Sequence, residues 1–343
     1  MPVCFISKVR RLVADPDLAL DLGTANTRLY ANGRGVIADE PSVVRISPDT
    51  GIIESVGARA ARREDYDAGR NFIAPLHGGV VADVSAAAAL LAPLLRRARR
   101  LGLLRPRVLA CVPSDACAEE REALIEATRR AGASAVTLTP EPLAAAVGIG
   151  LDISLPYAQL LVDIGDGVTD IAVIRSSALV STAAVRTACS DLISAVRNNI
   201  AALYGVELYQ REELRLIRSV GVGQRKLSSA PYVAAGADCR TGKLRRIPIN
   251  GQHVAEALDP VVAVIVEAVG RAVRELPPEL GSEVVESGIH LTGGGAGLPG
   301  IAELIAAETL LDVSPAKEPM KAVIRGASRI LKVGVATNVW QSE

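Results

Sequence analysis

The chain has 343 residues, of which 49% are hydrophobic and 3% aromatic, and its formal net charge at pH 7 is zero. A net charge of zero excludes a protein-wide field that attracts nucleic acid or a membrane, so such affinity must come from local patches. The five cysteines form no CxxC pair and the three histidines lie far apart, which argues against a structural metal site and indicates a reduced, cytoplasmic protein. The length is enough for two domains with cores of aliphatic side chains.

The segment VCFISKVRRLV, residues 3–13, is the first feature along the chain. It places Phe5, Ile6, Val9 and Leu12 on one face of a helix, with basic residues off that face. This pattern predicts a short anchor on an anionic membrane surface. A frayed terminus, or a helix docked on the protein body, explains it equally well. The segment lacks the apolar core of a signal peptide.

Strand-like and helix-like segments then alternate. Strands are predicted at residues 18–22 and 27–31 around a tight turn, and at residues 107–113. Residues 118–132 predict a helix, with glutamates early and arginines late, as the helix dipole favours. Residues 135–150 predict a strand that leads directly into a helix of small residues, and a second hairpin follows.

The second half continues this alternation. A long helical zone is predicted at residues 191–220, then a turn-rich small subdomain at 221–251 and a helix at 253–276 that two prolines end. A strand GIHLT, the run GGGAG and a helix IAELIAAETL follow. The pattern predicts an α/β protein of two lobes with mixed sheets and crossover helices.

The turns of the two hairpins repeat each other, since DLGTANT begins at Asp21 and DIGDGVT begins at Asp163 with the same spacing. A tight glycine turn exposes backbone N–H groups that can bind phosphate, and Gly165 and Gly167 are the donors expected in the second turn. The two aspartates can hold the water shell of Mg²⁺. Ordinary hairpin turns, in which Gly, Asn and Asp are common, are the alternative. The repeat favours phosphate binding.

Two further features have local alternatives. The run LTGGGAGLPG, residues 291–300, allows close approach to a flat ligand or a phosphate, or only tight packing of a strand-to-helix link. Glu141 lies between two prolines where a strand becomes a helix, so its backbone has little freedom. It can orient an attacking water near a phosphate, or simply favour the first turn of a helix. The local sequence alone favours the second explanation.

Together these segments resemble the actin-like ATPase superfamily and, within it, the MreB group of bacterial cell-shape filament proteins. The resemblance runs along nearly the whole chain, through DLGTANTRLY, DEPSVV, PLHGGVVADV, RVLACVP, EPLAAAVGIGL, DIGDGVTDIAVI, PPEL, LTGGGAGL and IRGASRIL. Chaperone and sugar-kinase relatives share the loops but not the flanking segments.

The resemblance implies an actin-like ATPase fold of two lobes, each with a mixed sheet flanked by helices and a smaller inserted subdomain, and a nucleotide cleft between them. Lobe I is expected at residues 1–156 plus 324–343, with its small subdomain at about 33–75. Lobe II is expected at residues 157–323, with its small subdomain at about 190–250. ATP and magnesium are the implied cofactors.

By position, the resemblance also implies the site residues. Glu141 matches the catalytic acid, and Asp21 and Asp163 would reach magnesium through water. The nucleotide contacts would come from Asp21, Gly23, Thr24, Ala25, Asn26, Thr27, Asp163, Gly165, Asp166, Gly167, Val168, Thr169, Arg215, Gly293, Gly294, Gly295 and Ala296.

The chain departs from the family at several of these positions. Asp166 places a carboxylate near an anionic ligand, and Val168 lacks the hydroxyl of the usual threonine. Ala188, Cys189 and Ser190 stand where the family has Gly-Gly-Asp. The adenosine segment Glu-Arg-Ile-Lys aligns with residues 214–217, of which only the arginine is kept.

Two basic stretches are candidate contact surfaces. Arginines flank the loop LGLL, residues 101–104, where Leu103 and Leu104 would touch a membrane as in relatives; a solvated helix face with a buried loop is the alternative. The strip CRTGKLRR, residues 239–246, would face a filament neighbour or solvent. We expect no nucleic-acid partner, because no aromatic residues interleave with these charges.

Two hypotheses remain for the function. The first is an MreB-like protein, peripheral on the inner face of the cytoplasmic membrane, that self-associates into nucleotide-dependent filaments. With membrane proteins of morphogenesis and cell-wall synthesis, these filaments would direct cell shape. The alternative is a non-hydrolysing pseudo-ATPase scaffold or adaptor of the same machinery. The departures favour the scaffold, whereas Glu141 and DLGTANT favour the ATPase. A small-molecule kinase would need a sugar pocket, and a chaperone would need a substrate domain; neither is found.

Overall fold

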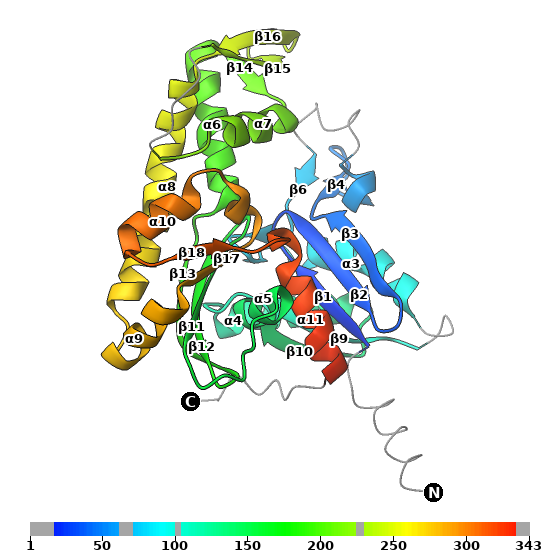
Figure 1. Ribbon diagram of the computed structural model, residues 1–343. Helices are drawn as coiled ribbons and strands as arrows, with labels where there is room; N and C mark the ends of the chain where they lie inside the picture. The colour runs from blue at the N-terminus through cyan, green and yellow to red at the C-terminus, as the bar shows by residue number, and fades with distance from the viewer. Residues whose placement is uncertain (1–16, 62–70, 100–103, 224–229, 334–343) are drawn as a thin grey trace, which may run out of the picture. The chain divides into compact units, whose positions relative to one another are not determined.

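The computed structural model describes residues 17–61, 71–99, 104–223 and 230–333 (Figure 1). The chain divides into two compact units, Met1–Ile153 with Lys321–Glu343, and Ser154–Met320. Each unit has a central five-stranded sheet and helices, so the α/β class and the mixed sheets flanked by helices are confirmed. No helix within the described ranges is long and apolar enough to cross a membrane.

The central sheet of the first unit has the strand order β10-β9-β1-β2-β3. β1 runs parallel to β9, and β9 to β10, whereas β1, β2 and β3 form an antiparallel meander. Because side chains alternate along β1, Leu18 and Leu20 pack with helices α3 and α4, and Ala19 packs with α5 and α11 on the other face. The bounds are β1 (Leu18–Leu22), β2 (Asn26–Ala31), β3 (Gly35–Pro41), β9 (Arg107–Val112), β10 (Ala135–Pro140), α3 (Val84–Ala98), α4 (Ala118–Arg130), α5 (Glu141–Ile149) and α11 (Ala322–Val333).

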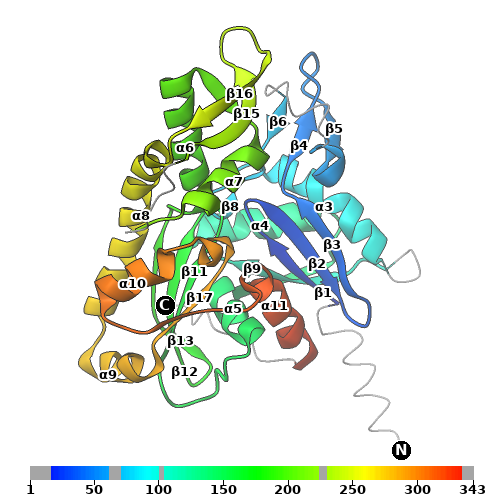
Figure 2. The same cartoon turned by 45° about the horizontal axis from the view of Figure 1, so that its top comes forward.

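Helices α5 and α11 lie side by side in both views (Figures 1 and 2) and touch through their backbones. A Cβ atom at Gly148 would lie 1.8 Å from the carbonyl oxygen of Ala322, and one at Gly326 would lie 1.6 Å from that of Ala144. Glycine at these two positions is therefore required for the crossing. The contact fixes α5, and hence Glu141 at its first residue, against the sheet.

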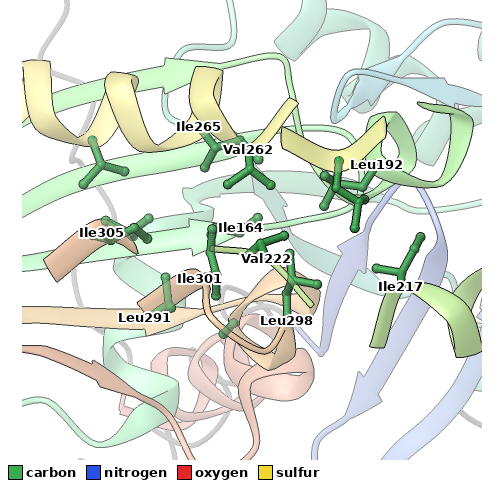
Figure 3. Packing of buried hydrophobic residues seen from close by; sticks show 14 of the residues in the cluster. Ile164, Leu192, Ile217, Val222, Val262, Ile265, Leu291, Leu298, Ile301 and Ile305 are labelled. Carbon is green, nitrogen blue, oxygen red and sulfur yellow. The ribbon is translucent and has the colours of Figure 1, made fainter. Parts of the chain in front are cut away.

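The central sheet of the second unit repeats this topology with the order β18-β17-β11-β12-β13. β11 takes the place of β1, since it runs antiparallel to β12 and parallel to β17. Figure 3 shows Ile164 and Leu291 of this sheet packed with Leu192, Ile265 and Ile301 from helices α6, α8 and α10. The bounds are β11 (Gln159–Ile164), β12 (Thr169–Arg175), β13 (Ala178–Val185), β17 (Ile289–Thr292), β18 (Val313–Pro315), α6 (Cys189–Tyr204), α8 (Gly251–Arg274), α9 (Pro278–Ser287) and α10 (Ile301–Thr309).

Each unit also carries small sheets. In the first, β5-β4-β6 form one and β7-β8 another; in the second, β14-β15-β16 form one beside helix α7. The bounds are β4 (Val44–Ile46), β5 (Ile53–Val56), β6 (Phe72–Ile73), β7 (Leu76–His77), β8 (Val80–Val81), β14 (Val206–Leu208), β15 (Tyr232–Asp238), β16 (Leu244–Ile249) and α7 (Gln210–Val220). Short 3₁₀ turns are η1 (Gly57–Arg59), η2 (Gly294–Gly297) and η3 (Pro319–Lys321).

The helical zone predicted at residues 191–220 consists of two helices, α6 and α7. Gly205 ends α6 in the left-handed conformation, with φ of 63°, and β14 separates α6 from α7. The stretch at 221–251, expected to be irregular, contains the antiparallel pair β15–β16. β15 is Ala-rich and β16 contains two consecutive arginines, so hydrophobic alternation does not reveal them.

Candidate functional site

Asp21, Cys111 and Glu141 come together at one edge of the first unit. They stand at or just after the carboxyl ends of β1, β9 and β10, which are parallel neighbours with Leu20 opposite Ala110 and Thr139 opposite Cys111. The pKa of the Cys111 thiol is raised well above its usual value, first by burial and then by the carboxylates of Asp21 and Glu141. Both acids therefore lie near one thiol, at the edge where α/β sheets bind ligands.

The first turn is held closed by its own backbone and by Ser42. The N–H of Gly23 donates to the carbonyl of Asn26 at 3.1 Å, and the Ser42 hydroxyl donates to the carbonyl of Gly23 at 2.6 Å. Ser42 Oγ also lies 2.8 Å from Thr27 Oγ1. Ser42 belongs to the DEPSVV segment, but its role in the turn was not predicted. The N–H groups of Thr24 and Ala25 donate no hydrogen bond within the described ranges.

The second turn closes in the same way, with the N–H of Gly165 donating to the carbonyl of Val168 at 2.9 Å. Gly165 is therefore not the phosphate donor that the sequence predicted, because its N–H is used inside the turn. The N–H groups of Asp166, Gly167 and Val168 donate no hydrogen bond to any described part of the chain, although Gly167 and Val168 are buried. Buried N–H groups without acceptors are rare, so these point to an absent acceptor.

The second turn also meets the start of helix α6. The carbonyls of Gly165 and Asp166 accept hydrogen bonds from the N–H groups of Cys189 and Ser190, at 3.3 and 2.9 Å. Thr169 donates its hydroxyl to the carbonyl of Thr187 at 2.8 Å. The turn's carbonyls thus face α6, which leaves the opposite, N–H side of the turn for an anion.

Burial raises the pKa of an acidic side chain in each of the two turns. The pKa of Asp21 is raised to about 6, mainly by burial, against the lowering effect of Arg28. The pKa of Asp166 is also raised, by burial and then by the charge of Asp191. Each turn therefore places a poorly solvated carboxyl group close to its N–H groups, where an anion needs compensating positive charge.

The glycine run serves both packing and a pocket. A Cβ atom at Gly293 would lie 2.4 Å from Oδ1 of Asp163, and one at Gly295 would lie 2.3 Å from Cγ2 of Ile164. These two glycines are required by tight packing against the end of β11. Gly294 is exposed, and a Cβ atom there would meet only Cys189 Sγ, at 3.8 Å. Among the three consecutive glycines, Gly294 is thus the one with room for a ligand; Gly297, where a Cβ atom would meet nothing within 4 Å, also lines the pocket described next, while Ala296 is buried.

A pocket of ≈ 60 Å³ opens beside Gly294, between α6, α7 and η2. Its walls include Leu192, Leu214, Ile217 and Arg218. Arg215 does not line it. Instead Arg215 donates to Oε2 of Glu212 at 2.6 Å and to the carbonyl of Val233.

Arg218 is the arginine that the sequence reasoning missed. The spacing of Leu214, Ile217 and Arg218 on one helix face is the signal that could have found it. Burial raises the pKa of Cys189, another wall residue, to about 12. The charges of Asp166 and Asp163 add to this rise and Arg218 opposes it. The pocket and the second turn are therefore neighbours.

The residues present fit a magnesium nucleotide. Besides the turn N–H groups, the hydroxyls of Thr139 and Thr292 are buried without a hydrogen-bond partner in the described part of the chain. Thr139 lies two residues before Glu141, and Thr292 pairs with Asp163 across the sheet. No group of three or more His, Cys, Asp or Glu side chains among the described residues could hold a metal directly. Asp21 and Asp163 suit contact through water, as Mg²⁺ commonly uses.

The predicted membrane residues are mostly untested by the structure. Phe5, Ile6, Val9, Leu12 and Leu103 lie outside the described residues. Leu104 is described, and 60% of its surface is exposed.

Comparison with known proteins extends the resemblance. The family model for the MreB/Mbl protein matches residues 15–338. The cell shape-determining protein Mbl of Bacillus subtilis (strain 168) is 34% identical over 318 residues, covering 92% of this chain and 95% of its own. The cell shape-determining protein MreB of Escherichia coli (strain K12) is 34% identical over 324 residues, covering 92% and 93%.

Solved structures show the same fold. MreB 5 of Spiroplasma citri bound to AMPPNP has a TM-score of 0.82 at 28% identity, covering 93% of this chain and 97% of its own. The MamK double helical filament has a TM-score of 0.73 at 22% identity, covering 92% and 98%. The two units are therefore those of the actin-like fold, and the chain belongs to the MreB/Mbl family.

Proposed function

We propose that this chain is an MreB-like cytoskeletal protein that binds ATP with magnesium and self-associates into filaments that determine cell shape. The observation that carries the proposal is the set of N–H groups without acceptors in two turns of matching geometry, Gly23–Asn26 and Gly165–Val168. Relatives named cell shape-determining proteins support the cellular role. The Spiroplasma citri relative, bound to AMPPNP or ADP, supports the nucleotide.

Each unit supplies one phosphate-binding turn in this proposal. The N–H groups of Thr24 and Ala25, and those of Asp166, Gly167 and Val168, donate to phosphate oxygens. Gly23, Asn26, Thr27, Gly165 and Thr169 shape the turns. Asp21 and Asp163 contact the water shell of magnesium, which would neutralise phosphate charge.

Glu141 and the pocket have separate roles. The Glu141 carboxylate accepts a hydrogen bond from the attacking water and orients it, from the rigid start of α5. The adenosine lies in the pocket beside Gly294 and Arg218. Gly293, Gly295 and Ala296 hold the floor of that pocket against β11.

The non-hydrolysing scaffold remains the second candidate, for specific reasons. Val168 offers no hydroxyl, and the pocket wall presents Leu214 and Ile217 where the family carries charged residues. Asp166, with its raised pKa, adds a carboxyl group beside the second turn. These features weaken contacts to the nucleotide and favour binding without turnover.

One experiment separates the two candidates. It measures ATP affinity and ATP turnover, with Mg²⁺, for the purified unmodified chain and for the Glu141→Ala variant. We expect micromolar-range binding in both, and turnover reduced at least ~100-fold in the variant, because general-base groups contribute about that factor or more. Glu122→Ala, an exposed acid on α4, is the matched control and should leave turnover unchanged. Binding without turnover in the unmodified chain would establish the scaffold instead, and absence of binding would refute the nucleotide-binding proposal.

The membrane role is proposed from the N-terminal segment and from Leu103 and Leu104. Filaments on the inner face of the cytoplasmic membrane would there direct cell-wall synthesis together with membrane proteins. Deletion of residues 1–13 should reduce co-sedimentation with anionic liposomes several-fold, since apolar burial and basic charge both contribute to binding. Liposomes of neutral lipid are the control. Unchanged co-sedimentation of the deletion variant would refute the anchor.

A further inference from the structure

Asp21, Arg28 and Asp39 form a row across three neighbouring strands of the sheet, just behind the first turn. Asp21 on β1 is directly opposite Arg28 on β2, and Arg28 is directly opposite Asp39 on β3. Arg28 Nη1 lies 3.4 Å from Asp21 Oδ2, and Arg28 Nε lies 3.2 Å from Asp39 Oδ1. The side chains of Arg28 and Asp21 are only 12% and 9% exposed, whereas that of Asp39 is 46% exposed. The inner of the two ion pairs is therefore the one shielded from solvent.

The second unit carries different residue types at the matching strand positions. There Asp163 is directly opposite Asp170, and Asp170 is directly opposite Ala184. The two hairpins share their turn hydrogen bond and their register. The strand position that Arg28 holds in the first hairpin is therefore held by an aspartate in the second.

We propose that Arg28 is a built-in counter-ion that offsets the charge of Asp21, so that the first turn binds nucleotide phosphate with reduced dependence on Mg²⁺. This inference rests on the proposed nucleotide binding. Asp21 is buried three residues before Thr24, so its ionised carboxylate repels a phosphate held by the N–H groups of the turn. A positive charge is needed there, since interactions between poorly solvated charges are strong.

Two sources can supply that charge. One is magnesium bound through water, and the other is the guanidinium of Arg28, which already lies beside Asp21. Removing Arg28 should therefore leave magnesium as the sole source. A purely structural ion pair would instead affect folding and would change nucleotide affinity equally with and without magnesium.

The test measures ATP affinity of the full chain by calorimetry, in excess EDTA and in excess Mg²⁺. For Arg28→Met we expect a loss of about tenfold or more in EDTA and a change within about threefold in Mg²⁺, since tenfold is a modest electrostatic effect for a buried charge. Arg28→Lys keeps the charge and should stay within about threefold of the unmodified chain in both buffers. Arg45→Met, which removes an arginine paired with Glu54 at 3.1 Å on β4, is the matched control.

The outcomes separate this inference from the proposed function. An unmodified chain that binds no ATP in either buffer overturns both. An unmodified chain that binds ATP, with the same ratio of affinities in the two buffers for Arg28→Met, overturns only the role of Arg28. Circular dichroism checks that the variants fold. If Arg28→Met does not fold, the same affinities are measured for Arg28→Gln, which keeps a hydrogen bond to Asp21 without the charge.

Discussion

Asp21 is the residue at which burial and charge conflict most clearly. Only 6% of it is exposed, and its pKa is raised from 3.8 to about 6, chiefly by burial, while Arg28 opposes the rise. The folded state therefore binds the proton more tightly than the unfolded chain does. The stability that the neutral form contributes is fully present below pH 3.8 and is lost as the pH rises through about 6. A shift of this size is on the order of 3 kcal/mol.

This predicts that the effect of Asp21→Asn on the free energy of unfolding depends on pH, because the asparagine side chain is neutral at every pH. The free energy of unfolding of the variant, relative to the unmodified chain, should rise by up to about 3 kcal/mol between pH 4 and pH 7. Denaturant unfolding of both proteins across this range measures it. Asp49→Asn, in the exposed turn before β5, is the control. A difference that stays constant with pH would contradict this account of Asp21.

Some site residues could be predicted from the sequence and others could not. The turn motifs indicated Asp21, Asp163 and Gly167 directly, because the repeat makes their spacing visible. Ser42 closes the first turn by a hydrogen bond to Gly23, which lies 19 residues away in sequence. No local sequence pattern predicts a contact over this separation. Arg215 was expected by alignment, yet it bonds to Glu212 on α7 and to the carbonyl of Val233 on β15. Helix phase, which alignment ignores, decided which arginine reached the pocket.

At the scale of elements, the crossing of α5 and α11 holds the edge of the first unit that carries Glu141. Cβ atoms at Gly148 and Gly326 would clash with backbone atoms of the opposite helix, at 1.8 and 1.6 Å. Gly148→Ala and Gly326→Ala should each lower the free energy of unfolding by about 2–4 kcal/mol, because the helices must separate. Thermal unfolding followed by circular dichroism measures the loss.

Gly281→Ala is the matched control for this prediction. Gly281 lies inside α9, and a Cβ atom there would meet nothing within 4 Å. That substitution should stabilise the protein by up to about 1 kcal/mol, from helix propensity alone. Equal effects at Gly281 and Gly148 would show that the close crossing has no energetic role.

Most elements were predictable because strong hydrophobic periods and glycine or proline stops mark them. The hairpin β1–β2, the strand β9 and the β10–α5 junction lie within a residue or two of their expected ends. The break between α6 and α7 was not predicted, since Gly205 alone signals it and a glycine inside a helical pattern is often tolerated. The pairing of α5 with α11 joins residues about 180 apart, which no local pattern specifies.

At the scale of the whole molecule, the two units repeat one sheet topology and one turn geometry. The repeat explains why the sequence carries two versions of one motif. In the proposed function, nucleotide binding at these turns controls self-association. The domain limits expected from the sequence, with small subdomains at about 33–75 and 190–250, stay predictions.

The most direct measurement is high-speed pelleting of the purified chain with Mg-ATP, with Mg²⁺ alone, and with Mg-ATP for Gly294→Val. Valine at this exposed position should fill the pocket without disturbing the fold, because only Cys189 Sγ lies near its Cβ atom. We expect the unmodified chain to pellet with Mg-ATP. Pelleting should fall at least about fivefold without nucleotide and in the variant, as linkage between binding and assembly requires. Gly281→Ala should pellet normally. Equal pelleting of the unmodified chain with and without nucleotide would contradict the proposal that nucleotide binding controls self-association.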